Sequence, residues 1–253
     1  MAHNDRSKKK IKLVILNPDS NGISGLTNQI YDVKLRGEEI MFNFTPDYFY
    51  NLILSLPGIL IAISFHEMAH GYAADSMGDP TPKNAGRLTL NPLKHIDPLG
   101  FISMLIFRFG WAKPVPVNPG NFKDRKKGMI VVSLAGVLTN LLLAFFGMAA
   151  YLAVVPLNNE ALMLVLQYIY IYNIMFAVFN IIPIPPLDGS QILVLFLPPK
   201  ALMTYYKYQR YGMIAIFVLA FTGLLGMIIN PVINGIASLF FAILLPIFNL
   251  IWS

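Results

Sequence analysis

The sequence predicts an all-α polytopic membrane protein with about five transmembrane helices and a re-entrant or short β element between the first two. Of its 253 residues, 56% are hydrophobic and only 13% are charged, whereas soluble domains average about a quarter charged residues. The mean hydropathy is +0.59. Stretches that are apolar enough to cross a bilayer, which takes about 20 residues, cover residues 46–74, 129–156, 161–183, 211–229 and 232–252.

Residues 1–40 differ from the rest of the chain because they are polar. They hold seven of the nineteen Lys and Arg residues and five of the thirteen Asp and Glu residues. We expect an N-terminal leader here, either disordered or appended to the core, with a regulatory tail as the alternative. The rest of the chain is expected to form a membrane-embedded core over residues 41–200 and a C-terminal helical pair over residues 201–253.

Positive charge lies in the connections between the predicted spans. Residues 74–127 carry nine Lys and Arg and residues 198–210 carry three, whereas residues 157–160 carry none. Short basic loops stay on the cytoplasmic side of a membrane, so the first span is expected to run inward. This topology accounts for the net charge of +6, and we therefore expect no nucleic-acid partner. The chain has no cysteine, which excludes disulfides, thiolate catalysis and cysteine metal sites.

The connection between the first two spans is rich in proline and glycine and contains one short apolar run. That run, residues 101–107, is too short to cross a bilayer. We expect an interfacial or re-entrant element with short strands at residues 86–90 and 113–117.

The first span ends in a cluster of ionisable residues, His66-Glu67-Met68-Ala69-His70. Helical residues four apart project from one face, so His66 and His70 can bind a single ion. Glu67 lies beside the first ligand, where its carboxylate can accept a proton from a water that the metal activates. Zinc is the metal that suits this arrangement best, because imidazole nitrogen is one of its favoured ligands. The alternative is that both histidines only form hydrogen bonds inside the helix bundle, with Glu67 paired to one of them.

A catalytic zinc site needs a third protein ligand. The remaining histidines are His3 and His95, and the residue six positions after His70 is Ser76. Among the later carboxylates, only Asp188 is flanked by apolar sequence, in NIIPIPPLDG. Prolines there interrupt the helix, and irregular backbone at membrane depth is tolerated only inside protein or beside a water-filled cavity. Asp188 is therefore the candidate third ligand.

The two motifs together, His66-Glu67-x-x-His70 and the Asn180 to Gly189 segment, resemble those of the site-2 protease family of intramembrane zinc metalloproteases. The resemblance covers about residues 45–200, and it is to the minimal form without PDZ or CBS domains. It implies that His66, His70 and Asp188 bind one Zn2+ per chain and that Glu67 is the general base. The core over residues 41–200 would then be the metalloprotease unit.

Two asparagines are further candidates for catalysis. The resemblance implies that Asn180, which opens the second motif, orients the substrate or Asp188. Asn140 resembles the family's active-site asparagine, a donor to the substrate carbonyl, and an ordinary interhelical hydrogen bond is the alternative. His95 is expected to have an interfacial structural role, with substrate handling as the alternative. A stripe of small residues on one helical face predicts close packing, and it comprises Ser133, Gly136, Asn140, Ala144 and Gly147.

The resemblance implies a zinc metalloendopeptidase that hydrolyses peptide bonds within or near membrane-spanning segments of substrate proteins. Its partners would be a membrane-protein substrate and the lipid bilayer, with the active site toward the cytoplasmic side of the cell membrane. A strand edge over residues 86–90 would hold an unwound substrate by strand addition. The alternative function is a zinc or proton transporter, which would need polar residues through the depth of the membrane. No oligomeric state is predicted.

Overall fold

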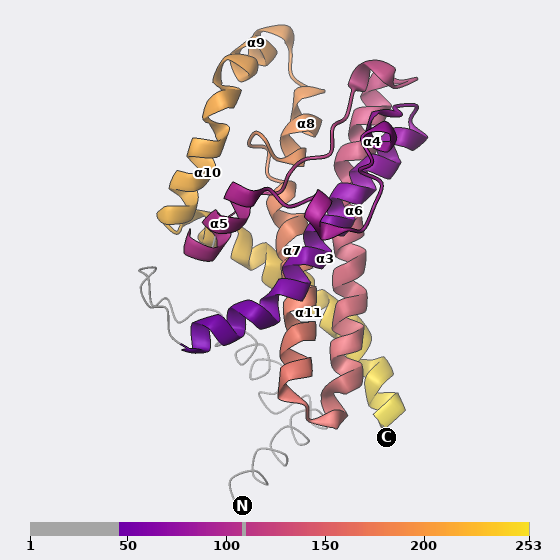
Figure 1. Cartoon of the computed structure of the whole chain (residues 1–253), viewed down its shortest axis with the longest axis vertical. Helices are drawn as coiled ribbons and strands as arrows, with labels where there is room; N and C mark the ends of the chain where they lie inside the picture. The colour runs from indigo at the N-terminus through magenta and orange to yellow at the C-terminus, as the bar shows by residue number, and fades with distance from the viewer. Residues whose placement is uncertain (1–45, 108–109, 253) are drawn as a thin grey trace, which may run out of the picture. The chain divides into compact units, whose positions relative to one another are not determined.

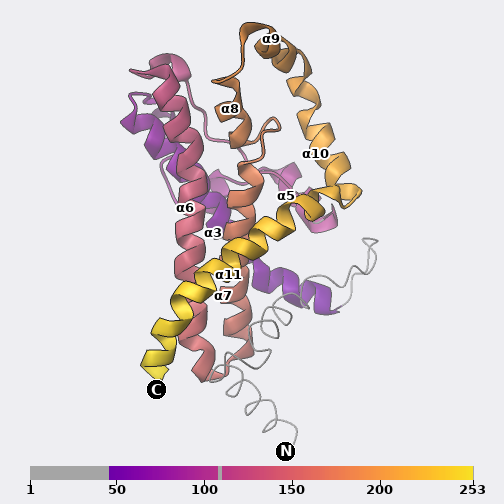
Figure 2. The same cartoon turned by 180° about the vertical axis from the view of Figure 1, so that it is seen from behind.

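Three long helices form the core of the protein. The computed structural model describes residues 46–107 and 110–252, so the predicted leader at residues 1–40 lies outside the described residues. Helices α3 (Pro46–Ser76), α6 (Arg125–Val154) and α7 (Glu160–Asn180) each pack against the other two (Figures 1 and 2). Each is apolar and, at 1.5 Å per residue, long enough to cross a bilayer.

Two of the core helices, α6 and α7, are capped at their starts by the side chain of the preceding residue. Asp124 accepts a hydrogen bond from the N–H of Lys127 at 2.9 Å and so begins α6. Asn159 accepts one from the N–H of Leu162 at 3.1 Å and begins α7. Such caps satisfy one of the N–H groups that a helix end leaves unpaired.

Small residues let the core helices approach closely. The predicted stripe on α6 is buried along its whole length, from Ser133 to Gly147. A Cβ added at Gly147 would lie 3.1 Å from the Ile169 side chain of α7. A Cβ added at Gly58 of α3 would lie 2.7 Å from the Tyr168 carbonyl oxygen, so α3 and α7 touch through their backbones there. The prediction of close packing is confirmed.

The all-α membrane fold is confirmed, but the span predicted at residues 211–229 is wrong. In the described ranges four helices are long and apolar enough to cross a membrane. The predicted span is divided between α10 (Gly212–Phe221) and the start of α11 (Leu224–Trp252). Gly223 lies between them with a φ of +77°, a conformation that favours glycine and ends the first helix. The ten residues of α10 measure about 15 Å, which is too short to span.

The connection between α3 and α6 lies close to both helices but contains no strand in its described part. It forms α4 (Thr81–Asn84), a 3-10 turn at Pro92–Lys94, α5 (Pro98–Phe107) and a 3-10 turn at Pro119–Asn121. The strands expected at residues 86–90 and 113–117 do not form, and one isolated bridge joins Ile96 to Ala112. The second segment contains two prolines, which cannot donate to a ladder. The structure therefore offers a substrate no strand edge over residues 86–90.

After α7 the chain turns irregularly through residues 181–187 before α8 (Asp188–Val194) and α9 (Pro199–Tyr208). The chain divides into two compact units, of which one covers Thr45–Ala237 and contains every residue of the site described next. The structure describes residues 238–252 of the other unit.

Candidate metal centre

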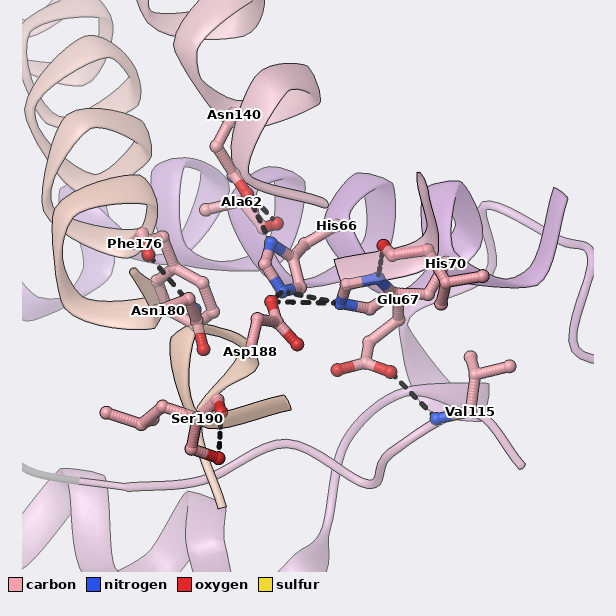
Figure 3. Close-up of polar contacts among 12 residues, drawn as sticks. Ala62, His66, Glu67, His70, Val115, Asn140, Phe176, Asn180, Asp188 and Ser190 are labelled. Atoms are coloured by element: carbon pink, nitrogen blue, oxygen red, sulfur yellow. Dashed lines mark hydrogen bonds and ion pairs between the residues drawn. The ribbon is translucent and has the colours of Figure 1, made fainter. Parts of the chain in front are cut away.

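Three predicted ligands from two distant parts of the sequence converge at one point. His66 and His70 project from α3, and Asp188 is the first residue of α8 (Figure 3). The two Nε2 atoms lie 2.9 Å apart. Asp188 Oδ2 lies 3.1 Å from Nε2 of His66 and 3.2 Å from Nε2 of His70. Both histidines are buried, and the aspartate is partly buried.

The tautomer of His66 is fixed by a buried amide. Asn140, fully buried on α6, directs its side-chain NH2 to the Ala62 carbonyl at 3.1 Å and to Asn173 Oδ1 at 2.8 Å. Its side-chain oxygen therefore faces His66 Nδ1 at 2.6 Å. Since that oxygen can only accept, Nδ1 of His66 carries the proton and Nε2 presents a lone pair.

The tautomer of His70 is fixed by a backbone carbonyl. Its Nδ1 lies 2.8 Å from the Val132 oxygen on α6. A carbonyl oxygen accepts hydrogen bonds, so Nδ1–H is the donor and Nε2 again presents a lone pair. An outer hydrogen bond of this kind is the usual partner of a metal-binding histidine.

These contacts test whether a zinc ion fits the site. With both imidazoles neutral, two Nε2 lone pairs and a carboxylate oxygen face one another, which is a set of three acceptors converging on one point. Asp188 Oδ2 is buried without a hydrogen bond. Ligands on a tetrahedral zinc ion are about 3.3–3.4 Å apart, given bonds of about 2.0–2.1 Å, close to the observed 2.9–3.2 Å. The donor set fits zinc, and three protein ligands leave one position open.

A tight turn places Asp188 opposite the histidines. Leu187 is extended (ψ 155°) and precedes the first turn of α8. Gly189 packs directly onto the Ile181 carbonyl, where any Cβ would overlap it. Ser190 Oγ–H donates to the Leu187 carbonyl at 2.6 Å and is fully buried. The Asp-Gly pair of the motif thus lets the chain fold back on the end of α7.

Gly136 provides the space that the His66 ring occupies. A Cβ at this position of α6 would lie 2.5–2.8 Å from three atoms of the imidazole. Asn140 follows one helical turn later and holds Nδ1 of the same ring. The stripe of small residues therefore shapes the site as well as the helix packing.

Glu67 lies beside the ligands and is buried. Its Oε2 accepts a hydrogen bond of 2.8 Å from the backbone N–H of Val115, in the connection between α3 and α6 (Figure 3). No hydrogen bond in the described part of the chain occupies its other oxygen.

The remaining candidate residues make other hydrogen bonds. Asn180 donates from its side chain to the Phe176 carbonyl of its own helix at 3.0 Å. Asn140 already uses both side-chain hydrogens, on Ala62 and Asn173. His95 is fully buried, and its Nε2–H donates to the Thr89 carbonyl at 2.7 Å, a structural contact.

Sequence reasoning missed two contributors to the site. Asn173 is fully buried on α7, where it accepts from Asn140 and donates to the Ile169 carbonyl at 2.8 Å. An asparagine inside an apolar span was an available signal for an interhelical contact. The N–H of Val115 is a backbone group, and no side-chain pattern could have identified it.

Comparison with known proteins decides the family. Residues 155–226 match the model described as Peptidase family M50. The protein named "Putative zinc metalloprotease YwhC", from Bacillus subtilis, is 38% identical over 200 residues, which are 75% of this chain and 91% of that protein. The chain belongs to peptidase family M50. The predicted resemblance to site-2 proteases is therefore confirmed.

Further relatives agree with M50 membership. "Putative zinc metalloprotease Rip2" of Mycolicibacterium smegmatis is 30% identical over 176 residues, 67% of each chain. "Putative zinc metalloprotease MJ0611" of Methanocaldococcus jannaschii is 30% identical over 169 residues, 65% of this chain and 83% of that protein. No solved structure matches. An M50 member is a peptidase, and no comparison favours the transporter alternative.

Proposed function

We propose that this M50 peptidase is a zinc metalloendopeptidase that hydrolyses peptide bonds within or near membrane-spanning segments of other proteins. The observation that carries the proposal is the convergence of His66, His70 and Asp188 beside Glu67 among helices long enough to cross a membrane. A bound zinc ion would supply Lewis-acid polarisation of the scissile carbonyl and would lower the pKa of water.

The protein's own groups divide the work of this reaction. Glu67 accepts a proton from the attacking water and returns it to the leaving amine. His66 and His70 are ligands held in one tautomer by Asn140 and by the Val132 carbonyl, and Asp188 supplies the anionic ligand. Asn140 acts on His66, because its amide hydrogens are committed to Ala62 and Asn173.

Substrate handling follows from the position of the site. A helical substrate hides its carbonyls in hydrogen bonds, so the segment to be cleaved must unwind before it reaches Glu67. Asn180 keeps a side-chain oxygen for a substrate N–H, since its amide nitrogen is held by Phe176. The basic residues of the connection between α3 and α6 favour the cytoplasmic side of the cell membrane for this end of the core.

Metal content tests the ligand set. Detergent-purified wild type, His66→Ala and Asp188→Ala are compared by elemental analysis. We expect about one zinc per chain in wild type. The zinc should be lost in His66→Ala and reduced in Asp188→Ala. Zinc unaffected by Asp188→Ala would remove this residue from the ligand set.

Cleavage tests the chemistry. The probe is a synthetic membrane-spanning peptide of Leu and Ala with a central Gly-Ser interruption, labelled with a fluorophore and a quencher, in phosphatidylcholine vesicles. Glu67→Gln is expected to keep its zinc and lose cleavage. Cleavage at the wild-type rate in Glu67→Gln would refute its role as general base.

A further inference from the structure

We propose that Arg87 is a positioning residue that holds the Glu67 carboxylate in place through a single peptide group, the one between Pro114 and Val115. This inference rests on the proposed function, in which Glu67 moves the proton. Arg87 lies twenty positions after Glu67, and its side-chain hydrogen bonds go to the Pro114 and Lys113 carbonyls and not to a candidate metal ligand. Its effect is transmitted through the backbone of the connection between α3 and α6.

The first contact joins Glu67 to this peptide group. The N–H of Val115 donates to Glu67 Oε2 at 2.8 Å. A glutamate side chain has three rotatable bonds, and burial removes the water that would otherwise solvate its charge. A backbone donor therefore both compensates the buried charge and selects one orientation of the carboxylate. The other oxygen is left for proton transfer.

The second contact joins Arg87 to the same peptide group from its opposite side. Arg87 is buried. Its Nη1 donates to the Pro114 carbonyl at 3.0 Å, and its Nη2 donates to the Lys113 carbonyl at 2.6 Å. The Pro114 carbonyl and the Val115 N–H belong to one planar peptide unit. Among described residues the only cis bond is Pro185–Pro186, so this unit is trans.

Planarity couples the two contacts mechanically. In a trans peptide the C=O and the N–H point in opposite directions, and rotating one rotates the other. A guanidinium that fixes the Pro114 oxygen therefore also fixes the direction of the Val115 N–H toward Glu67. A cation on the oxygen polarises the peptide and strengthens the N–H as a donor. The Arg87 cation and the Glu67 anion thus interact through one peptide group.

The surrounding contacts keep this peptide group against α3. Val115 is buried, and its side chain lies 3.6 Å from where a Cβ would stand on Gly71, one helical turn after Glu67. The N–H of Lys113 donates to the His95 carbonyl at 2.8 Å. Prolines at 114 and 116 restrict φ on both sides of Val115. The peptide group is therefore a rigid support for the carboxylate.

A spectroscopic experiment tests the coupling without measuring activity. Zinc-loaded protein in detergent is labelled with 13C-carbonyl proline and 15N valine, which selects the amides of Val115, Val117 and Val232. The Val115 signal is assigned by its disappearance in Val115→Ala. We expect its amide proton to move upfield in Glu67→Ala and in Arg87→Met, because each change weakens the hydrogen bond. The other two signals should stay in place and report correct folding.

The possible outcomes distinguish the contact between Val115 and Glu67 from the role of Arg87. A Val115 signal that does not move in Glu67→Ala would refute the contact with the carboxylate. A signal that moves in Glu67→Ala but not in Arg87→Met would refute the role of Arg87. Cleavage retained in Glu67→Gln would instead refute the proposed role of Glu67 as general base, and it would leave the spectroscopic coupling unchanged.

A kinetic experiment tests what the support does. Val115→Pro removes the N–H donor at a position already flanked by prolines, and it also replaces the buried valine side chain. Val115→Ala, which loses the side chain and keeps the N–H, is therefore the control for packing. We expect kcat to fall about 10- to 100-fold with KM and zinc content unchanged, since substrate and metal contacts remain. Val117→Pro is the matched control, because the N–H of Val117 makes no hydrogen bond among the described residues. A wild-type kcat in Val115→Pro would overturn the inference, and if this variant loses zinc the spectroscopic experiment decides.

Discussion

The Nδ1–H of His66 donates a 2.6 Å hydrogen bond to the side-chain oxygen of Asn140, which lies 74 positions later in the chain. Asn140 is itself oriented by the Ala62 carbonyl on α3 and by Asn173 on α7. The direction of one candidate metal ligand is therefore set by all three core helices. Movement of any of these helices relative to the other two would disturb the ring of His66.

Replacing Asn140 should weaken metal binding. Asn140→Ala removes the acceptor that selects the His66 tautomer, and outer-sphere changes of this kind cost about 10- to 100-fold in metal affinity. The dissociation constant for zinc would be measured by competition with a chromophoric chelator. Leu142→Ala, on the exposed face of the same helix, is the control. Unchanged affinity in Asn140→Ala would mean that the tautomer is held by other groups.

Gly136→Ala should displace the His66 ring. The added methyl group would lie 2.5 Å from Cε1 and 2.6 Å from Nδ1, and neither α6 nor the ring can yield without breaking the bond to Asn140. We expect purified Gly136→Ala to contain less than one zinc per chain. Gly235→Ala makes the same change where nothing lies within 4 Å of the added atom. Equal zinc content in the two variants would refute the proposed packing.

Zinc should stabilise the folded protein through the three candidate ligands. A ligand that binds only the folded state adds about 4 kcal/mol when its concentration is 1,000-fold above Kd. Adding zinc to chelator-treated wild type should therefore raise Tm in detergent, and Asp188→Asn should show a smaller shift. Glu160→Gln removes one exposed carboxylate at the start of α7 and should respond like wild type. Equal shifts in wild type and Asp188→Asn would argue against Asp188 as a ligand.

Local sequence patterns predicted most of the framework. Apolar length identified α3, α6 and α7, because a membrane-spanning helix is encoded within its own residues. The spacing of His66 and His70 is likewise local to one helix. The false span at residues 211–229 arose because hydropathy measures only polarity. Gly223 is not polar, so it does not interrupt the apolar stretch, but its positive φ ends the helix.

The parts of the site that escaped prediction depend on contacts between distant segments. Asn173 acts on Asn140 of another helix, and a single sequence does not show which face of α7 meets α6. Val115 contributes a backbone N–H, which every residue except proline possesses. The strands expected at residues 86–90 and 113–117 did not form. Instead, the Arg87 side chain donates hydrogen bonds to the carbonyls of Lys113 and Pro114. Tertiary hydrogen bonds therefore replaced the predicted ladder.

Asp79 ties the end of α3 to the segment that carries Val115, and its removal should destabilise the fold. It is fully buried and accepts hydrogen bonds from the N–H and hydroxyl of Thr81, from the Asn118 N–H at 2.7 Å and from the Asn121 side chain at 2.7 Å. Asp79→Asn replaces one carboxylate oxygen, which accepts hydrogen bonds, with an NH2 group. That NH2 group would face a hydrogen-bond donor. We expect the free energy of unfolding to fall by about 1–3 kcal/mol.

The pH dependence of this loss identifies the charge as its cause. Burial alone would raise the pKa of Asp79, but the hydrogen bonds from Thr81, Asn118 and Asn121 outweigh it and hold the pKa below its ordinary value. A carboxyl whose pKa is lower in the folded state stabilises fully above its unfolded pKa, about 3.9, and loses this contribution as pH falls through the folded pKa.

The free energies of unfolding of wild type and Asp79→Asn should therefore differ by a constant amount near neutral pH and converge below about pH 4. Denaturant titrations in detergent at several pH values would measure the difference. Asp75→Asn, one helical turn earlier, removes the same charge from a carboxylate without hydrogen bonds among the described residues, and should change stability little. A difference that stays constant down to pH 2 would show that Asp79 stabilises the fold by its shape and not by its charge.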